Sequence, residues 1–191
     1  PQQLPAVEYG FANFVALAGH LDWIANTLLI AVGGTVLGTA IGVALAWIIH
    51  RTTVPGRGWF ELLVAIPYPL GPLVGALAWS QLGAPGDGLI NRFFKWVTGA
   101  GFPLIDIYTP TGIIFVEAIF EAPVAVLIIG AAMQRMDPAL EESSAVFGGG
   151  KLRTAFKITV PLMMPAILSA ALFMFASIIG SFAIPTILGT N

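Results

Sequence analysis

The sequence predicts an all-α fold, a bundle of helices that crosses a membrane several times. Hydrophobic residues make up 57% of the 191 residues and charged residues only 9%, whereas soluble domains carry about 25% charged residues. Four apolar segments also reach the roughly 20 residues that a helix needs to cross a bilayer. The mean hydropathy is +0.89, so we expect the lipid bilayer, and not nucleic acid, as its surroundings. The absence of cysteine excludes disulfides and thiolate metal sites.

The expected spans cover residues 27–49, 62–82, 112–133 and 162–184. Asn26 or Thr27 suits the N-cap of the first span. Residues 1–25 are only mildly apolar, and we expect them to form a periplasmic or interfacial approach segment. Residues 26–191 would form one transmembrane domain. Because the chain starts without an initiator Met and stops just past an apolar run, we expect it to be a fragment truncated at both ends.

Basic residues orient the spans. Six of the eight Lys and Arg residues lie between the first and second spans or between the third and fourth, so these two loops should face the cytoplasm. The remaining loop faces outside and contains an amphipathic segment, residues 89–97. We expect this segment to lie along the outer interface with Trp96 at headgroup level. A gating or receptor-contacting role is the alternative.

Small residues form a stripe along one face of the first span, where Gly34, Gly38 and Gly42 recur every four residues. Small residues at this spacing let helices approach closely in lipid. The stripe therefore predicts a packed helix interface and carries no information about substrate.

Pro67, Pro69 and Pro72 interrupt the second span. Irregular backbone at membrane depth is tolerated where protein or a water-filled cavity covers it. These prolines predict either a kink that lines a translocation path or a bent packing helix.

Glu117 and Glu121 lie four residues apart in the third span and so share one helix face. Intramembrane carboxylates are costly and usually face the bundle interior or an aqueous path. Two interpretations stay open, a cation-friendly lining of a pathway and a structural pair bonded to neighbouring helices. His20 and His50 lack ligand-like spacing, so we expect no metal site.

Between the third and fourth spans, residues 138–147 predict a short polar helix that projects from the membrane. Asp137 is a good N-cap, Pro138 fits the first helical position and Gly148 is placed to end the helix with a positive φ. Leu140 and Phe147, with Val146, can insert into the groove of a partner. An ordinary amphipathic connector is the alternative.

The run Gly148-Gly149-Gly150-Lys151 does not form a nucleotide-binding P-loop. That motif requires a glycine at the position of Ala145 and a Ser or Thr at the position of Leu152. We therefore expect no ATP chemistry and no catalytic site on this chain.

The same loop contains a spaced motif: Glu142-Ser143-Ser144, three residues, Gly148, nine residues, then Ile158-Thr159-Val160-Pro161. This motif resembles the "EAA" loop of the membrane subunits of binding-protein-dependent ABC importers, which reads Glu-Ala-Ala, three residues, Gly, nine residues, Ile-x-Leu-Pro. Serines replace the two alanines and Val160 replaces the leucine. The spacing from Glu142 to Pro161 is intact.

The resemblance covers roughly residues 26–190. The ending Phe182-x-x-Pro185-x-x-Leu188-Gly189 resembles the ferric-iron-type branch and, less closely, polyamine and thiamine permeases. Members of that branch often carry two halves in one chain, and this piece is similar to the first half.

The resemblance implies a type I importer permease with a MetI-like fold in the bacterial inner membrane, with iron as the expected cargo. Its partners would be cytoplasmic ATPase subunits that hold ATP and Mg²⁺, a second permease half and an extracytoplasmic binding protein. Glu142 and Gly148 would fix the coupling helix, Ile158 and Pro161 would anchor its return into the fourth span, and Leu140 and Phe147 would fill the ATPase groove. Glu141, Ser143 and Ser144 complete the expected contact set.

Two other function classes remain. A proton-coupled secondary transporter would use Glu117 and Glu121 as proton carriers and would need no ATPase. A membrane scaffold would show no substrate-stimulated activity. A polar cytoplasmic helix with the importer spacing is unexplained if the chain is a secondary transporter.

Overall fold

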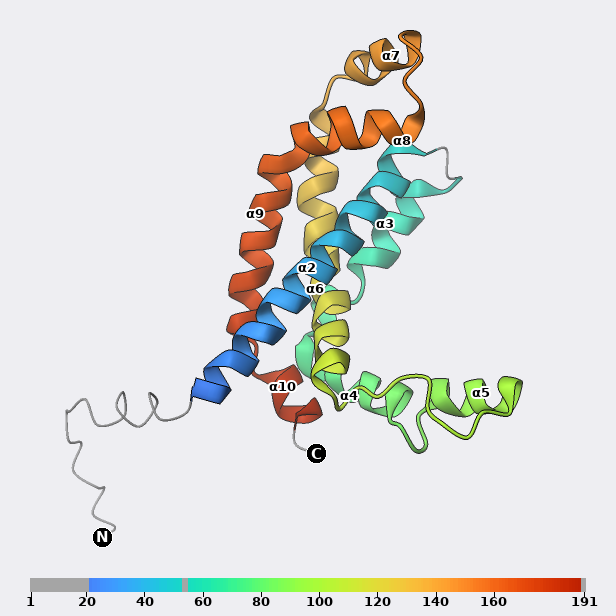
Figure 1. Cartoon of the computed structure of the whole chain (residues 1–191), viewed down its shortest axis with the longest axis vertical. Helices are drawn as coiled ribbons and strands as arrows, with labels where there is room; N and C mark the ends of the chain where they lie inside the picture. The colour runs from blue at the N-terminus through green and yellow to red at the C-terminus, as the bar shows by residue number, and fades with distance from the viewer. Residues whose placement is uncertain (1–20, 53–54, 190–191) are drawn as a thin grey trace, which may run out of the picture.

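The structure is a computed structural model that describes residues 21–52 and 55–189. Within these residues every regular element is a helix, which confirms the expected fold class. Figure 1 shows three long helices packed side by side, with a short helix projecting at one end and another at the opposite end. The long helices are α2 (Leu21–Arg51), α6 (Pro110–Arg135) and α9 (Val160–Ile179), and the projecting ones are α7 (Ala139–Val146) and α5 (Leu89–Thr98).

Three helices of the described residues are long and apolar enough to cross a bilayer, namely Leu21–Arg51, Pro110–Arg135 and Ala155–Ile179. The first is longer than expected. Asn26 and Thr27 lie inside α2, where the Thr27 hydroxyl donates to the carbonyl of Trp23 at 2.9 Å, so neither residue is an N-cap. Residues 1–20 of the expected approach segment lie outside the described residues, and residues 21–25 belong to α2.

The second expected span is not one continuous helix. It consists of α3 (Arg57–Ala65), the 3-10 turn η1 (Tyr68–Leu70) and α4 (Pro72–Gly83), and the chain bends by 102° between the two halves. Gly71 has a φ of 79°, a left-handed conformation that suits glycine, and Pro72 starts α4. The prolines therefore break the span outright.

The fourth span begins earlier and ends earlier than expected. A continuous but bent helical segment, which we call the rod, runs through α8 (Lys151–Thr154), the π-helix η2 (Ala155–Thr159) and α9 (Figure 1). Pro161 lacks the N–H that an α-helical bond would use, which favours the wider turn before it. The rod stops at Ile179, and residues 183–188 form the separate helix α10 (Ala183–Leu188).

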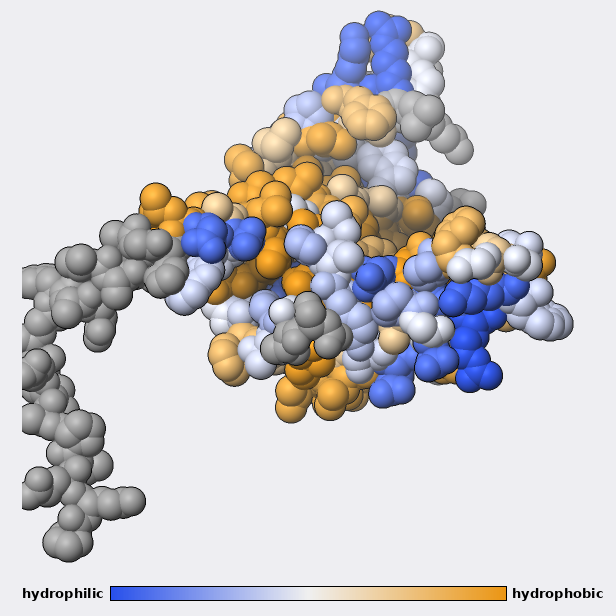
Figure 2. Space-filling model, turned by 60° about the horizontal axis from the view of Figure 1, so that its bottom comes forward, coloured by the Kyte–Doolittle hydropathy of each residue, from blue (hydrophilic) through white to orange (hydrophobic). Residues whose placement is uncertain are grey.

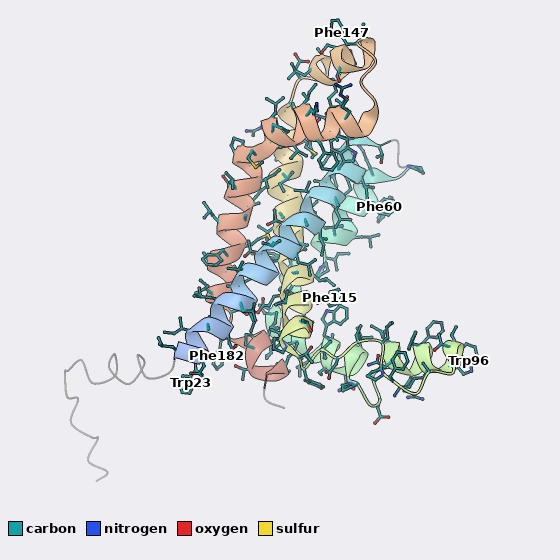
Figure 3. The ribbon with its side chains drawn as sticks, viewed as in Figure 1. Trp23, Phe60, Trp96, Phe115, Phe147 and Phe182 are labelled. Atoms are coloured by element: carbon teal, nitrogen blue, oxygen red, sulfur yellow. The ribbon has the colours of Figure 1, made fainter. Side chains whose placement is uncertain are left out.

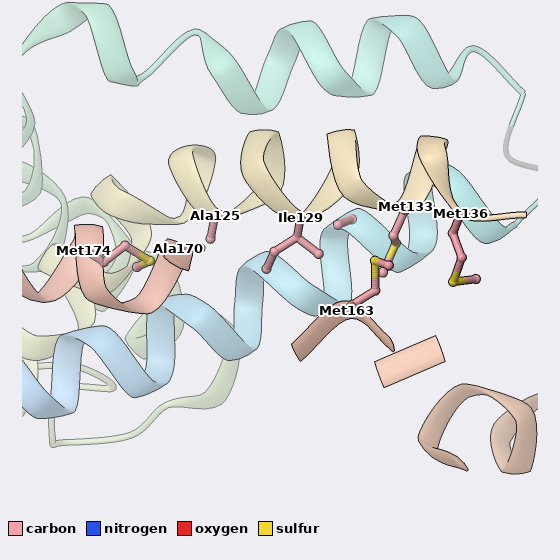
Figure 4. Close-up of a cluster of buried hydrophobic side chains, with 8 residues drawn as sticks. Ala125, Ile129, Met133, Met136, Met163, Ala170 and Met174 are labelled. Atoms are coloured by element: carbon pink, nitrogen blue, oxygen red, sulfur yellow. The ribbon is translucent and has the colours of Figure 1, made fainter. Parts of the chain in front are cut away.

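Helix α6 is the centre of the bundle and contributes to both buried apolar clusters. One cluster joins α6 to α2 and α9 in the half nearer α7 (Figure 4). The other joins α6 to α4 and α10 in the opposite half. The first cluster contains Ala46, Ala125, Ile129, Met133, Met136, Met163, Ala170 and Met174; the second contains Ala76, Ile107, Ile113, Val116, Phe120, Ile184 and Leu188.

The stripe of small residues on α2 lies against α6 and α9. Gly34, Gly38 and Gly42 are all buried. A Cβ at Gly34 would lie 2.9 Å from Ile178 Cδ1, and a Cβ at Gly42 would overlap the Cβ of Ala125. The missing side chains thus set how closely α2 approaches α6.

The two ends of the molecule differ in composition. The end that carries α7 also holds the C-termini of α2 and α6 and the start of α3 (Figure 1). Six of the eight Lys and Arg residues of the sequence belong to these segments and to the loop around α7. Figure 2 shows hydrophilic residues at this tip and hydrophobic ones over the spanning helices. At the opposite end lie the exposed aromatic residues Trp23, Trp96 and Phe182 (Figure 3). Such a distribution suits a membrane protein with α7 on the cytoplasmic side.

Candidate functional site

Helix α7 is capped at its start as the sequence predicts. The backbone N–H of Ala139 donates to Asp137 Oδ1 at 2.9 Å, and the N–H of Glu142 donates to the carbonyl of Pro138 at 3.0 Å. Pro138 needs no partner for its nitrogen at this position. The prediction for the N-terminal end of this helix is confirmed.

The end of α7 also agrees with the sequence. Gly148 has a φ of 78°, and no atom lies within 4 Å of where its Cβ would be. The conformation, and not a lack of space, therefore favours glycine here. The N–H of Gly149 donates to the carbonyl of Ser144 at 2.8 Å and closes the turn.

The tip of α7 presents apolar side chains to solvent. Phe147 is 90% exposed and Val146 is 83% exposed, and Phe147 points away from the bundle at the extreme end of the molecule (Figure 3). Leu140, on the first turn, is partly exposed. A large aromatic side chain held in water on a capped helix is suited to filling the groove of a partner.

The carboxylate that holds α7 against the bundle is Glu141. Arg51 Nε at the end of α2 lies 3.1 Å from Glu141 Oε1, and the Thr159 hydroxyl donates to the same oxygen at 2.7 Å. Glu142 is exposed. Glu141 is thus the carboxylate that lies against α2 and η2, and the expected role of Glu142 in fixing the helix stays a prediction.

A second polar contact joins the two sides of the loop. The hydroxyls of Ser144 and Thr154 lie 2.8 Å apart and link α7 to α8. Ser144 stands where the importer motif has alanine, and alanine has no hydroxyl for this bond. Ser143 is exposed, and its hydroxyl donates to the carbonyl of Leu140 within α7 at 2.9 Å.

The return into the membrane is anchored at Thr159. This residue is fully buried in η2, whereas its neighbour Ile158 is half-buried and Pro161 is exposed. The expected anchoring role of Ile158 and Pro161 stays a prediction, and Thr159 between them is the residue that is fully buried. Pro161 acts on the backbone, at the start of α9.

The carboxylate pair of the third span lies inside the bundle. Glu117 is 2% exposed and Glu121 is 6% exposed. The Ser177 hydroxyl on α9 donates to Glu121 Oε1 at 2.6 Å. The Ser177 bond fits the structural alternative for Glu121, whereas Glu117 Oε1 and Glu121 Oε2 are buried without a hydrogen-bond partner among the described residues, so both interpretations of the pair stay predictions.

The residues at the break of the second span have a different environment. Pro69 and Pro72 are exposed, and Pro67 is half-buried. Tyr68 and Leu70 between them are also exposed. This elbow thus presents an uncovered apolar face, which in a membrane contacts lipid or another chain.

His50 lies outside any metal-ligand constellation. Its Nδ1 is 3.8 Å from Glu61 Oε1, and no group of three or more His, Cys, Asp or Glu residues gathers within the described ranges. His20 lies outside the described residues.

Sequence reasoning missed four polar residues that organise the molecule: Arg51, Thr154, Thr159 and Asn91. Asn91 is fully buried in α5, and its side chain makes bonds of 2.8–3.0 Å with the backbone of Ala84, Leu104 and Ile105. An uncharged polar residue in the middle of an amphipathic segment was the available signal for Asn91. No local pattern marked the other three.

The known proteins that are similar to this chain in sequence are permeases of transport systems. The chain is 29% identical over 142 residues to the molybdenum transport system permease protein ModB of Escherichia coli K12, covering 74% of the chain and 59% of that protein. It is 26% identical over 156 residues to the sulfate transport system permease protein CysT of Salmonella typhimurium, covering 82% of the chain and 54% of that protein. The chain therefore spans between about half and three fifths of these relatives' length. No family model matches it.

The structure is similar to a bacterial ABC transporter involved in the import of the acidic polysaccharide alginate. The TM-score is 0.72 at 22% sequence identity, over 92% of this chain and 64% of that chain. A second structure of such a transporter, in complex with an alginate pentasaccharide-bound periplasmic protein, gives a TM-score of 0.68 at 23% identity. The chain thus has the fold of an ABC importer permease, and its sequence relatives are transport permeases.

Proposed function

We propose that this chain is part of the membrane permease of an ATP-driven importer and that a cytoplasmic ATPase docks on α7. The exposed tip of α7 carries this proposal. Phe147 is 90% exposed on a short helix whose two ends are fixed by Asp137 and Gly148. Such a helix offers a preorganised apolar knob, which costs a partner little ordering entropy.

The position of α7 supports the same conclusion. It projects at the end of the bundle where the basic residues gather, which the positive-inside rule assigns to the cytoplasm. ATP is available in that compartment. Because the chain has no P-loop, the ATP and Mg²⁺ would be held by the docking subunits.

The remaining parts of the importer would come from outside this chain. A second permease half would complete the pathway, as the resemblance to importer permeases implies. An extracytoplasmic binding protein would deliver the cargo, as the complex of the similar alginate transporter with its periplasmic protein suggests. The assembly would lie in the bacterial cytoplasmic membrane, and this chain would perform no covalent chemistry.

The proposal for the cargo rests on a sequence motif and not on the structure. Ferric iron is suggested by the C-terminal motif from Phe182 to Gly189 alone. The named relatives belong instead to molybdenum, sulfate, sn-glycerol-3-phosphate and trehalose systems. Glu117 and Glu121 give no support to a cationic cargo, because both are buried within the bundle. Polyamine and thiamine remain alternatives from the same motif.

The docking proposal is tested with the full-length permease, co-expressed with its second half and candidate ABC ATPases of the same organism. Phe147→Asp should abolish co-purification of the ATPase, because it places a charge in the groove. Phe156→Asp is the matched control, since Phe156 is 71% exposed in the same loop but lies on η2. Equal retention by the two variants would contradict docking through the α7 tip. No ATPase bound by the wild-type complex would contradict the importer proposal.

Uptake measurements separate the importer from the secondary transporter. Membrane vesicles containing the whole complex are supplied with ATP inside and, outside, with the binding protein and labelled ferric iron, molybdate or sulfate. ATP-dependent uptake that persists with a protonophore fits an ABC importer. Uptake that needs only a proton gradient would favour the secondary transporter, with Glu117 and Glu121 as its carriers.

A further inference from the structure

Four helical segments meet in one polar cluster at the cytoplasmic end, which we call the Arg51 cluster. It contains Arg51 of α2, Glu141 of α7, Thr159 of η2 and the backbone carbonyl of Met133 in α6. We propose that Arg51 is a positioning residue that fixes the angle of α7 against the bundle and passes a displacement of α7 to α2 and α6. The inference rests on the proposed role of α7 as the docking helix.

The guanidinium group joins three elements at once. Its Nε lies 3.1 Å from Glu141 Oε1 on α7, while its Nη2 donates to the carbonyl of Met133 on α6 at 3.1 Å. The Nε contact with Glu141 is an ion pair by distance and not a hydrogen bond, so the guanidinium makes one hydrogen bond, to Met133, and one electrostatic contact, to Glu141. A movement of Glu141 therefore changes the contact with both α2 and α6.

The ion pair between Arg51 and Glu141 is partly shielded from solvent, so it can contribute to holding α7 against the bundle. The side chain of Arg51 is 14% exposed and that of Glu141 is 23% exposed. Fully exposed ion pairs contribute little because water and salt screen them. Partial burial, together with the added bond from Thr159, favours a pair that holds one geometry.

The π-helix η2 brings the third partner into place. Thr159 is fully buried, and its hydroxyl donates to Glu141 Oε1 at 2.7 Å. Single π-turns inside longer helices occur often at functional sites. Here the wide turn lies between α8 and α9, so the same carboxylate that contacts α2 also contacts the rod leading into the membrane.

The backbone on either side of α7 does little to fix the direction of this helix, so the side chains of the Arg51 cluster must set it. The helix is only eight residues long and is followed by Gly148, Gly149 and Gly150. Such a glycine run restricts the chain less than any other composition. The Ser144–Thr154 bond and the Arg51 cluster are the polar side-chain contacts that tie α7 to the rest of the described chain.

The first test measures the position of α7 directly in the full-length permease. These 191 residues contain no cysteine, so once any cysteine elsewhere in the full-length permease is replaced by serine, spin labels can be placed at Ala139→Cys on α7 and at Leu172→Cys, a 70% exposed position on α9. Arg51→Gln and Glu141→Gln should each broaden the distribution of label distances. The double variant should be no broader than either single one, because the two residues share one interaction. Arg57→Gln, which removes an exposed arginine at the start of α3, should match the wild type.

The second test separates transmission from docking. In the complete complex, Arg51→Gln should leave the amount of bound ATPase unchanged but lower the ATP hydrolysis rate about 2- to 30-fold, the range expected for a change within a coupled network. A merely structural role would lower assembly and hydrolysis together. Reduced ATPase binding in Arg51→Gln would therefore overturn the transmission role.

The proposal is also overturned if Arg51→Gln matches Arg57→Gln in both label distances and hydrolysis. If the wild-type complex binds no ATPase, the docking function fails instead. The distance measurements on the permease alone still decide whether Arg51 positions α7. The two failures are thus distinguishable.

Discussion

The hydroxyl of Ser177 on α9 donates a 2.6 Å hydrogen bond to Oε1 of Glu121 on α6, where Glu121 is only 6% exposed. This bond joins two membrane-spanning helices through polar side chains. In a lipid environment such contacts replace part of the hydrophobic effect that holds soluble bundles together. Glu121 therefore contributes to the architecture of the bundle.

Replacing Ser177 with alanine should lower the stability of the bundle by about 1 kcal/mol, as for other interhelical hydrogen bonds in membranes. Thermal unfolding of the permease in detergent measures the effect. Ser169→Ala is the control on the same helix, because Ser169 is exposed and its hydroxyl donates to the carbonyl of Pro165 in its own helix. Equal unfolding temperatures for the two variants would argue against a structural role for the Ser177–Glu121 bond.

The glycine stripe should tolerate no added methyl group at Gly42. A Cβ there would overlap the Cβ of Ala125 in α6, so Gly42→Ala should push the helices apart and destabilise the bundle by about 1–3 kcal/mol, the usual cost of overpacking. Gly58→Ala in α3 should be neutral or slightly stabilising, since no atom lies within 4 Å of its added Cβ. Denaturant titration of both variants checks the prediction, and a neutral Gly42→Ala would refute close packing.

Asn91 should be essential for the order of the outer loop. Its side chain bonds to the partly buried backbone of Ala84, Leu104 and Ile105, so Asn91→Ala removes four hydrogen bonds, each worth about 0.5–1.5 kcal/mol. Limited proteolysis should then cut the loop between α4 and α6 much faster. Arg92→Ala, which changes an exposed neighbour, should leave the cleavage rate unchanged. Equal rates in both variants would contradict a central role for Asn91.

Helix α5 should lie at the outer membrane interface. Its exposed face carries Phe93, Trp96 and Val97, while the opposite side is fixed by Asn91. A fluorescent label at Trp96→Cys should be quenched by brominated lipid, because this face should contact acyl chains. The same label at Asp87→Cys, before the helix, is the comparison. Lack of quenching at position 96 would favour a protein partner for this face.

The elements of this fold were predictable where one local pattern decided them. The apolar length of α6 and the cap residues Asp137 and Gly148 gave correct positions, because hydropathy and capping act over a few residues. The interruption of the second span was predicted from its prolines, but the size of its bend and the helical start near Lys151 were not. A hydropathy window averages over a 102° bend, and a π-turn leaves no hydrophobic period of its own.

The candidate site, too, was predictable from local patterns only in part. The motif spacing located α7, yet it directed attention to Glu142 rather than Glu141. Which of two adjacent carboxylates faces the bundle depends on Arg51 and Thr159, which lie 90 residues before and 18 residues after Glu141 in the chain. Contacts between distant segments are set by tertiary packing, and a single sequence does not reveal them.

The two buried clusters differ in how easily they deform. Four of the eight buried members of the cluster nearer α7 are methionines, Met133, Met136, Met163 and Met174. The other cluster is built mainly from branched and aromatic residues such as Ile107, Ile113 and Phe120. Unbranched thioether chains change rotamer readily and refill gaps, whereas branched chains hold one shape. A small shift of α6 against α9 near α7 would therefore meet less resistance than a shift of α6 against α4 and α10.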